Sequence, residues 1–552
     1  MGHIRRLFFI FLLLIPSLAS AQFFVTGDDP GRLRWNFIDT ESYRVIYPQG
    51  ADSLAHTYAR KLEKYKVPIS RTSGYMTGDG DGKIMPVVMH AYNDANGSVA
   101  WAPKRMDLFT IPTAYAPEPM PWSNMLAIHE SRHVTQMQFG LTEKHRVGKW
   151  ILGDGWNMIS FLLYPNLTSM EGDAVVMETA LSPSGRGRTA DFLNYYWVAF
   201  DQGDFRDWFK WRFVSQLRYS PTYYALGYLT VGGYRYLYDQ PYFVSNALHY
   251  AAGHSGNVGC LETEVKRKSG KKWNEMWHEV CDSMYGKWKS EADRRAPYIP
   301  SERVLPESKR YTDYTDNIIV GSDLYTIKQG HVHTPALIRI DSTGKEHFVR
   351  SFAYTTSTPQ WDEESESLYW SESIPDSRWS LKSGSRIRYM KEAKGRKRSF
   401  RNKEMLFNPA YNKNLIASAR YHTDGHSSLE ILDRTTGKII ESYDAPDSLQ
   451  LVETSWIGDD IYVSAISENG YGIYLFSEGV YTSVLAPQPV MITNLNTYGD
   501  ELIFACDRTG VNELYHFNPA DGELRQKTST RYGAFDFQYS EDWENLYYSS
   551  QT

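Results

Sequence analysis

The sequence predicts a two-part chain, an α+β part over residues 22–298 followed by an all-β part over residues 299–552. Before residue 300, long segments with helical apolar periodicity alternate with short strand-like runs, and after it the helical periodicity disappears. In the second part, an aromatic residue, a polar turn and a β-rich run recur at steps of 41 to 50 residues. A chain of 552 residues is also too long for one ordinary domain.

Residues 1–21 have the pattern of a signal peptide. Arg5 and Arg6 precede the apolar run LFFIFLLLI, and Ala19-Ser20-Ala21 supplies a cleavage site. This run is too short to span a bilayer, which needs roughly 20 apolar residues, and no later run approaches that length. We therefore expect a mature protein that begins at Gln22, is exported to the periplasm or the cell exterior, and has no transmembrane segment.

Charge and cysteine content argue against a nucleic-acid-binding protein and a disulfide-rich protein. Lys and Arg total 59 against 65 Asp and Glu, and a net charge of −6 gives no electrostatic footprint for nucleic acid. The three cysteines, Cys260, Cys281 and Cys506, are too few for a disulfide scaffold. Cys260 and Cys281 either pair with each other or remain two buried thiols.

In the first part, residues 51–69 and 271–295 have the periodicity of amphipathic helices, and residues 42–48 and 84–92 are typical of strands. Between them, His129-Glu130-Ser131-Arg132-His133 matches H-E-x-x-H. On a helix, residues four apart share a face, so both imidazoles can bind one Zn²⁺ ion. Glu130 lies beside them, where it can exchange protons with a water bound to that ion. Ser123 and Gly140 are the expected caps of that helix. The alternative is a pair of surface histidines without a ligand role.

A catalytic zinc site usually takes three protein ligands. Gln136 and Phe139 occupy the positions where metzincins carry Gly and His, which excludes that class. Residues 171–178, EGDAVVME, resemble the E-G-x-A-x-x-x-E segment of gluzincin peptidases, which lies on a second helix. In that family the first glutamate is the third ligand, so the resemblance implies this role for Glu171.

Alternatives remain for the third ligand. Thr168-x-x-Glu171 is also a capping box, in which the carboxylate would only bond the start of the helix. His145 and Asp173 are weaker candidate ligands. His145 lies in the insertion of residues 140–166, which lengthens the gap between the two motifs and is expected to form a lid or a wall of the cleft.

Two further segments extend the resemblance. Tyr224-Ala-Leu-Gly227 is similar to the Tyr-x-x-Gly turn of gluzincin aminopeptidases and peptidase-MA-like proteins, where the tyrosine stabilises the oxyanion. A packing role for Tyr224 or its neighbour Tyr223 is the alternative. Residues 90–112 predict a strand, a loop and a strand, which in gluzincins form an exposed edge that pairs with substrate backbone. The candidate substrate contacts there are Asn96, Gly97, Ser98 and Ala100, unless the segment is an ordinary hairpin.

The second part is interpreted through its repeated aromatics. A period in the forties with about four strands per repeat is typical of β-propeller blades. The repeats resemble the WD40-like and TolB-like propellers of exported bacterial proteins. Five complete repeats and a partial sixth repeat predict five to six blades. Either the last strands close the ring onto the first blade, or the sequence is truncated within the sixth repeat. The leading aromatics are Tyr314, Trp361, Tyr411, Trp456, Tyr498 and Tyr539.

The resemblance covers residues 35–290 and implies an exported zinc metallopeptidase of the gluzincin, peptidase-MA-like type, with a C-terminal propeller that binds substrate or a protein partner. His129, His133 and Glu171 would hold Zn²⁺, Glu130 would act as general base on a peptide or protein substrate, and Tyr224 would stabilise the oxyanion. The alternative is a non-catalytic binding or scaffold protein with a structural or defunct zinc site. A fourth zinc position filled by protein would favour that alternative.

Overall fold

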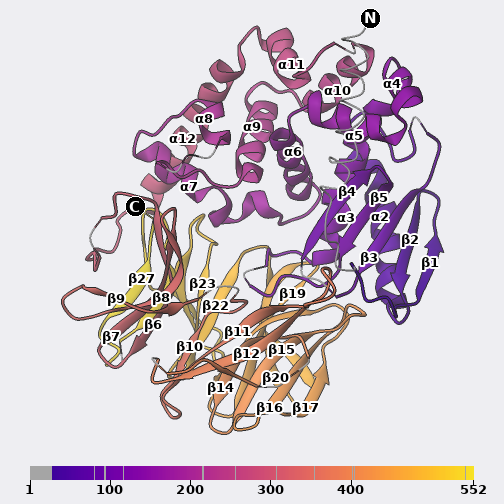
Figure 1. Cartoon of the computed structure of the whole chain (residues 1–552). Helices are drawn as coiled ribbons and strands as arrows, with labels where there is room; N and C mark the ends of the chain where they lie inside the picture. The colour runs from indigo at the N-terminus through magenta and orange to yellow at the C-terminus, as the bar shows by residue number, and fades with distance from the viewer. Residues whose placement is uncertain are drawn as a thin grey trace, which may run out of the picture.

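The computed structural model describes residues 28–551 apart from 80, 93, 94, 116, 214, 216, 255, 306, 353, 354, 394, 401, 403 and 541. The predicted signal peptide and its cleavage site therefore lie outside the described residues. A helical part built on one sheet lies against a ring of smaller sheets (Figure 1). The prediction of a part with helices and strands followed by an all-β propeller is confirmed at this level.

Among the residues that the structure describes, one five-stranded sheet underlies the first part, in the order β1-β2-β3-β5-β4. Its strands are β1 (Trp35–Asp39), β2 (Tyr43–Pro48), β3 (Met85–His90), β4 (Asn96–Trp101) and β5 (Lys104–Phe109). β2, β3 and β5 run parallel, whereas β1 and β4 are antiparallel to their neighbours. β4 therefore forms an edge of the sheet, as the resemblance implied, and it pairs with β5 as an antiparallel hairpin, which was the alternative.

Helices cover this sheet and extend beyond it. α2 (Asp52–Ser70) connects the parallel strands β2 and β3 and buries one face at three- and four-residue steps. Within the described residues, no helix has both the length and the apolar character needed to cross a bilayer. The other helices are α3 (Trp122–Met137), α4 (His145–Leu152), α5 (Asp154–Leu163), α6 (Leu167–Ala180), α7 (Ala190–Asp201), α8 (Trp208–Arg212), α9 (Tyr223–Leu237), α10 (Phe243–Gly253), α11 (Cys260–Ser269) and α12 (Trp273–Arg295), with 3-10 turns η1 (Gln138–Leu141) and η2 (Arg186–Arg188).

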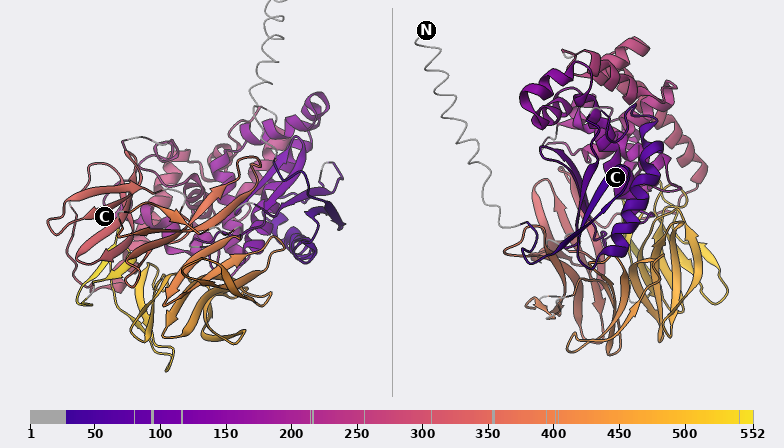
Figure 2. Two further views of the ribbon diagram at one scale, coloured as in Figure 1. Left: turned by 60° about the horizontal axis from the view of Figure 1, so that its bottom comes forward. Right: turned by 90° about the vertical axis from the view of Figure 1, so that its right-hand side faces the viewer.

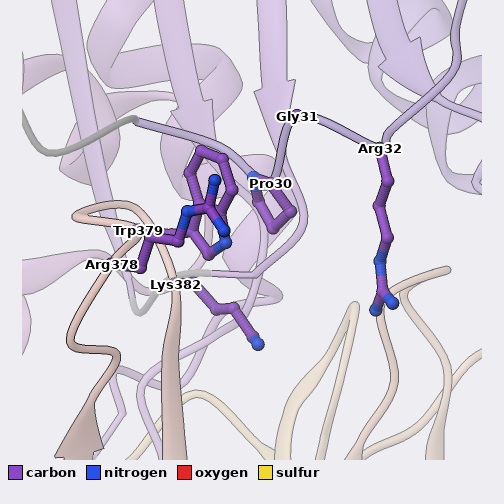
Figure 3. Close-up of a pocket in the computed structure, with 6 residues that line it drawn as sticks. All are labelled: Pro30, Gly31, Arg32, Arg378, Trp379 and Lys382. Carbon is purple, nitrogen blue, oxygen red and sulfur yellow. The ribbon is translucent and has the colours of Figure 1, made fainter.

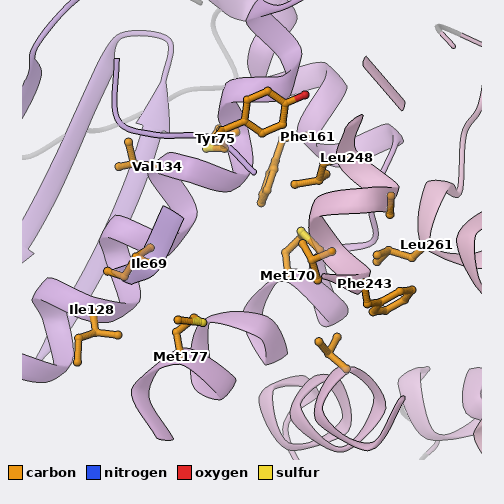
Figure 4. Close-up of a cluster of buried hydrophobic side chains, with 14 of the residues drawn as sticks. Ile69, Tyr75, Ile128, Val134, Phe161, Met170, Met177, Phe243, Leu248 and Leu261 are labelled. Carbon is orange, nitrogen blue, oxygen red and sulfur yellow. The ribbon is translucent and has the colours of Figure 1, made fainter. Parts of the chain in front are cut away.

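The core of the first part joins α3, α5, α6 and α10. Figure 4 shows Ile128 and Val134 of α3 among the same buried cluster as Met170 of α6 and Leu248 of α10. The three cysteines are buried and free, so the unpaired alternative holds for Cys260 and Cys281. This packing fixes α3 against α6, the two helices that carry the predicted metal ligands.

In the described residues, the second part is a β-propeller of five four-stranded antiparallel sheets and one two-stranded sheet. Each leading aromatic that the sequence predicted lies on the first strand of its sheet. The sheets are β6 (Thr312–Val320), β7 (Asp323–Gly330), β8 (His333–Ile340), β9 (Glu346–Ser351); β10 (Gln360–Asp362), β11 (Ser367–Pro375), β12 (Ser383–Lys391), β13 (Arg398–Ser399); β14 (Leu406–Asn412), β15 (Leu415–Tyr421), β16 (Ser427–Asp433), β17 (Ile439–Asp444); β18 (Gln450–Ile457), β19 (Asp460–Ser467), β20 (Gly470–Ser477), β21 (Val480–Gln488); β22 (Ile492–Tyr498), β23 (Glu501–Cys506), β24 (Glu513–Phe517), β25 (Leu524–Gln526); and β26 (Phe535–Tyr539), β27 (Leu546–Ser549).

The last two strands close the ring. β26 lies between β6 of the first sheet and β23 and β24 of the fifth. The Asn317 side chain on β6 donates to the Asp536 carbonyl and to Ser549 Oγ, both at 3.0 Å. The last strands therefore contact the first blade.

The propeller lies against the helical part (Figure 2). Two hydrogen bonds join it to the segment that precedes α3. Asn408 Nδ2 donates to the Ala114 carbonyl and Tyr471 OH to the Pro117 carbonyl, both at 2.8 Å. At the far end of the helical part, Arg531 makes two hydrogen bonds of 2.7 and 2.8 Å to Asp201. The start of α3 is thus held by the propeller as well as by its own core.

Candidate metal centre

α3 carries both histidines of the H-E-x-x-H motif. It begins at Trp122 after Pro121, and Ser123 does not cap it, because Ser123 Oγ accepts a hydrogen bond from Lys61 Nζ at 2.8 Å. The expected C-terminal cap at Gly140 is also wrong. α3 ends at Met137 and continues as the 3-10 turn η1, which contains Gly140. His129 and His133 are only 6% and 7% exposed, which contradicts the surface-histidine alternative.

Glu171 reaches these histidines from α6. The helix begins at Leu167, and the side chain of Asn166 caps it by accepting from the Ser169 amide at 2.8 Å. The capping-box alternative is therefore wrong, since Glu171 lies in the second turn and is not needed at the helix start. Its Oε2 lies 3.2 Å from His129 Nε2 and 3.1 Å from His133 Nε2.

The geometry of these three atoms fits a zinc ion. The two Nε2 atoms lie 3.1 Å apart, so each pair of candidate ligand atoms is separated by 3.1 to 3.2 Å. Tetrahedral ligands at zinc bond lengths of about 2.0–2.1 Å are separated from one another by about 3.3 Å. Two imidazole nitrogens and one carboxylate oxygen are also a donor set that zinc accepts in catalytic sites.

Two side chains to which the sequence analysis assigned no role orient the imidazoles. His129 Nδ1 lies 2.6 Å from Glu178 Oε1, and His133 Nδ1 lies 2.9 Å from Gln136 Oε1. When each Nδ1–H donates to these oxygens, each Nε2 presents its lone pair to the shared point. The sequence could have predicted the contact of Glu178, because it lies seven residues, or two helical turns, after Glu171 on the same face of α6.

Arg186, on the turn η2, completes this arrangement and had no sequence signal. It donates to both Glu178 oxygens, at 2.9 and 2.5 Å. Burial raises the pKa of Glu178, but Arg186 and His129 outweigh it and hold the pKa at about 2. Burial lowers the pKa of His129, but Glu171 and Glu178 outweigh it and raise it to about 9. The Glu171 and Glu178 carboxylates thus stabilise positive charge, such as that of a cation, beside His129.

Glu130 lies beside this point under the edge strand. Its side chain is buried and its Oε2 atom has no hydrogen-bond partner among the described residues. Burial raises the pKa of Glu130, although the two histidines lower it. A Cβ at Gly97 on β4 would lie 2.3 Å from Glu130 Oε1, so glycine is what lets the strand pass over the carboxylate. Because side chains alternate along a strand, Asn96, Ser98 and Ala100 lie on its other face.

Tyr224 lies in the first turn of α9. Its ring centroid is 6.1 Å from that of His129, and the Arg186 guanidinium lies over the ring at 5.2 Å. Burial and the nearby Glu171 carboxylate raise the pKa of Tyr224, so its hydroxyl remains a donor at neutral pH. Tyr223 stacks on Tyr224 with centroids 4.6 Å apart, as a packing partner.

The glycines of the two resembling motifs have a shared packing role. α6 and α9 cross at Gly172 and Gly227. A Cβ at Gly172 would lie 1.9 Å from the Gly227 carbonyl carbon, and a Cβ at Gly227 would lie 1.9 Å from the Thr168 carbonyl oxygen. This close crossing brings Tyr224 and Glu171 to the same side of the core.

Gly172→Ala is therefore expected to destabilise the protein by about 2–4 kcal/mol, because the added methyl meets backbone that cannot rotate away. Urea unfolding followed by circular dichroism measures this. Gly286→Ala on α12 is the matched control, since a Cβ there meets nothing within 4 Å. It should be neutral or stabilising by up to about 1 kcal/mol. Equal midpoints for Gly172→Ala and the wild type would contradict the close crossing.

The two weaker candidate ligands lie in other interactions. His145 packs against Phe139 and Tyr164, and its Nε2 lies 3.1 Å from the Ala251 carbonyl. Asp173 accepts from Arg132 Nε at 2.6 Å and from Gln136 Nε2 at 2.8 Å. Both side chains therefore support the helices around the site, and the structure does not bring them to the shared point.

Two other features of the described residues are less suited to catalysis. His422, His426 and Asp444 form a second group with ligand spacing on the propeller, but Asp444 is exposed and His422 Nε2 already lies 2.8 Å from Ser428 Oγ. A surface pocket lies where the N-terminal segment meets the loop between β11 and β12 (Figure 3). Cations and a tryptophan line it without a carboxylate: Pro30, Gly31, Arg32, Arg378, Trp379 and Lys382.

Comparison with known proteins gives no family. No family model matches the chain, and no curated protein matches it. The β-propeller domain of the Trilobed protease from Pyrococcus furiosus is 10% identical over 43% of this chain and 89% of that chain, with a TM-score of 0.30. Pyrococcus horikoshii acylaminoacyl peptidase is 12% identical over 44% of this chain and 49% of that chain, with a TM-score of 0.31. The tricorn protease is 8% identical over 43% and 26%, with a TM-score of 0.32. Scores this low assign no activity to the chain.

Proposed function

We propose that this protein is an exported, zinc-dependent metallopeptidase of the gluzincin type. The observation that carries the proposal is the meeting of His129 Nε2, His133 Nε2 and Glu171 Oε2 within 3.2 Å of one another in a buried site. The order of the supporting segments along the chain, from edge strand to H-E-x-x-H helix, glutamate helix and tyrosine turn, matches the resemblance. Export is proposed from the pattern of residues 1–21 alone.

When bound, Zn²⁺ would supply a Lewis acid that acidifies water and polarises the scissile carbonyl. Glu130 accepts a proton from the attacking water, whose oxygen bonds to the carbonyl carbon, and it returns that proton to the leaving amine as the C–N bond breaks. Burial raises the pKa of Glu130, which makes its carboxylate a stronger base for this exchange. The Tyr224 hydroxyl donates to the carbonyl oxygen as negative charge develops on it.

β4 is proposed to hold the substrate. It is an edge strand whose backbone passes over Glu130 at Gly97, so an extended peptide that adds to this edge would run beside the general base. The propeller is proposed to bind the substrate or a protein partner. A structural zinc site would need a fourth protein ligand, whereas the group among the described residues consists of three side chains.

The experiment that tests the function is digestion of a peptide library by the zinc-loaded protein. We expect peptide cleavage that chelation abolishes and added zinc restores, with the cleaved sites read by mass spectrometry. Cleavage that persists after complete metal removal would overturn the proposal.

A further inference from the structure

The α4–α5 hairpin exposes its apolar side chains and buries polar ones. α4 buries His145, and α5 buries Asn157, Ser160 and Phe161. Beside the charged Arg146 and Asp154, seven large apolar side chains on the two helices are exposed: Val147, Trp150, Ile151, Leu152, Ile159, Leu162 and Leu163. A helix that faces water normally has the opposite arrangement, and large apolar side chains exposed together on two adjacent helices mark an interaction surface.

The buried polar face of the hairpin anchors it beside the candidate metal centre. With its amide oriented to suit its neighbours, Asn157 donates to the Met137 carbonyl at 2.7 Å and accepts from the Trp101 indole at 3.1 Å. Met137 ends α3 and Trp101 ends β4. A Cβ at Gly148 would lie 2.3 Å from the Trp156 ring, so the two helices pack closely. The outward face is therefore presented by a fixed element.

The apolar residues lie on a protruding tip. Trp150, Ile151 and Leu152 are consecutive at the end of α4 and are 86%, 65% and 52% exposed. Figure 1 places α4 and α5 at the margin of the helical part, away from the propeller. A protein partner would need a matching groove, whereas the interfacial region of a bilayer accepts a convex apolar tip that contains tryptophan.

Basic residues flank this tip. Lys144, Arg146 and Lys149 lie beside it between the acidic Glu143 and Asp154, so residues 143–154 carry three basic and two acidic side chains in a chain whose net charge is −6. Lys104 and Lys83 lie near Lys149. Lys104 is largely buried and paired with Asp81 at 2.9 Å, so of these two only Lys83 adds exposed positive charge. A surface of this charge complements anionic lipid headgroups.

We propose that the α4–α5 hairpin docks the protein onto an anionic lipid bilayer, with Trp150, Ile151 and Leu152 inserted into the interfacial region. Docking holds β4 and the end of α3 close to the lipid surface. This inference does not depend on the proposed peptidase activity, because it rests on the outward face of the hairpin alone.

The test is co-sedimentation of the full chain with vesicles of phosphatidylcholine, with or without phosphatidylglycerol. We expect the wild type to bind the anionic vesicles and binding to fall at high salt. Changing Trp150, Ile151 and Leu152 together to Ser should weaken binding on the order of tenfold or more. Arg146→Gln with Lys149→Gln should remove the preference for anionic vesicles.

Phe348→Ser on the propeller is the matched control, because Phe348 is also an exposed large apolar side chain. It should bind vesicles as the wild type does, and all variants should retain the circular dichroism spectrum of the wild type. Wild-type protein that stays in solution with both vesicle types, or a triple variant that binds equally well, would overturn the proposal. So would light scattering that shows a wild-type dimer and a monomeric triple variant, since the tip would then join two copies.

Discussion

Glu130→Gln is expected to lower peptide hydrolysis by about 10²- to 10⁴-fold while zinc content stays unchanged. Glutamine has the same shape as glutamate, so the contact beneath Gly97 is preserved. It cannot accept the proton of the attacking water, and this is the function assigned to the unpartnered Glu130 oxygen. The measurement is kcat/KM on a cleaved library peptide together with metal analysis of the same sample.

Glu291→Gln on α12 makes the same chemical change at an exposed position and should hydrolyse the peptide at the wild-type rate. Hydrolysis by Glu130→Gln that equals the wild type would refute its role as general base. Loss of zinc together with activity would instead show that Glu130 serves the metal and not the proton transfer.

His133→Ala is expected to abolish both zinc binding and hydrolysis. Two of the three ligand atoms would remain, and the Glu171 carboxylate would lose one of its two imidazole partners. Changes to the residues that merely orient ligands typically cost 10–100-fold in metal affinity, so removal of a ligand should cost more than about 100-fold. Metal content after dialysis and affinity by chelator competition measure the loss.

His426→Ala is the matched control for this variant. His426 belongs to the second group with ligand spacing, on the propeller, so it removes one imidazole from the same protein. Zinc content and hydrolysis should both remain at wild-type values. Zinc that is lost from His426→Ala and kept by His133→Ala would place the ion on the propeller.

Local sequence patterns predicted the elements of the site better than their ends. The four-residue spacing put His129 and His133 on one helix face, and the repeated aromatics located the first strand of every propeller sheet. The predicted starts of α3 and α6 were wrong because another residue that favours a helix start lies two positions before each predicted one. Pro121 precedes the first turn of α3 before Ser123, and Asn166 caps α6 before Thr168.

Long-range partners and the outward face of a helix were not predictable. Arg186 lies 57 residues from His129 on a 3-10 turn, and no local pattern joins it to Glu178. Residues 140–166 were expected only to form a lid or a wall of the cleft, and apolar periodicity alone does not say which face of a helix meets the core. Buried Asn157 and exposed Trp150 reverse the usual assignment, and only the packing of the hairpin on α3 and β4 reveals it.

The central claim is that one zinc ion is shared by ligands from α3 and α6. Anomalous diffraction at the zinc absorption edge, from crystals of the zinc-loaded protein, locates that ion directly. We expect one strong peak about 2.0–2.2 Å from His129 Nε2, His133 Nε2 and a Glu171 carboxylate oxygen. A peak elsewhere, or a Glu171 side chain turned away from the histidines in the zinc-loaded crystal, would contradict the claim.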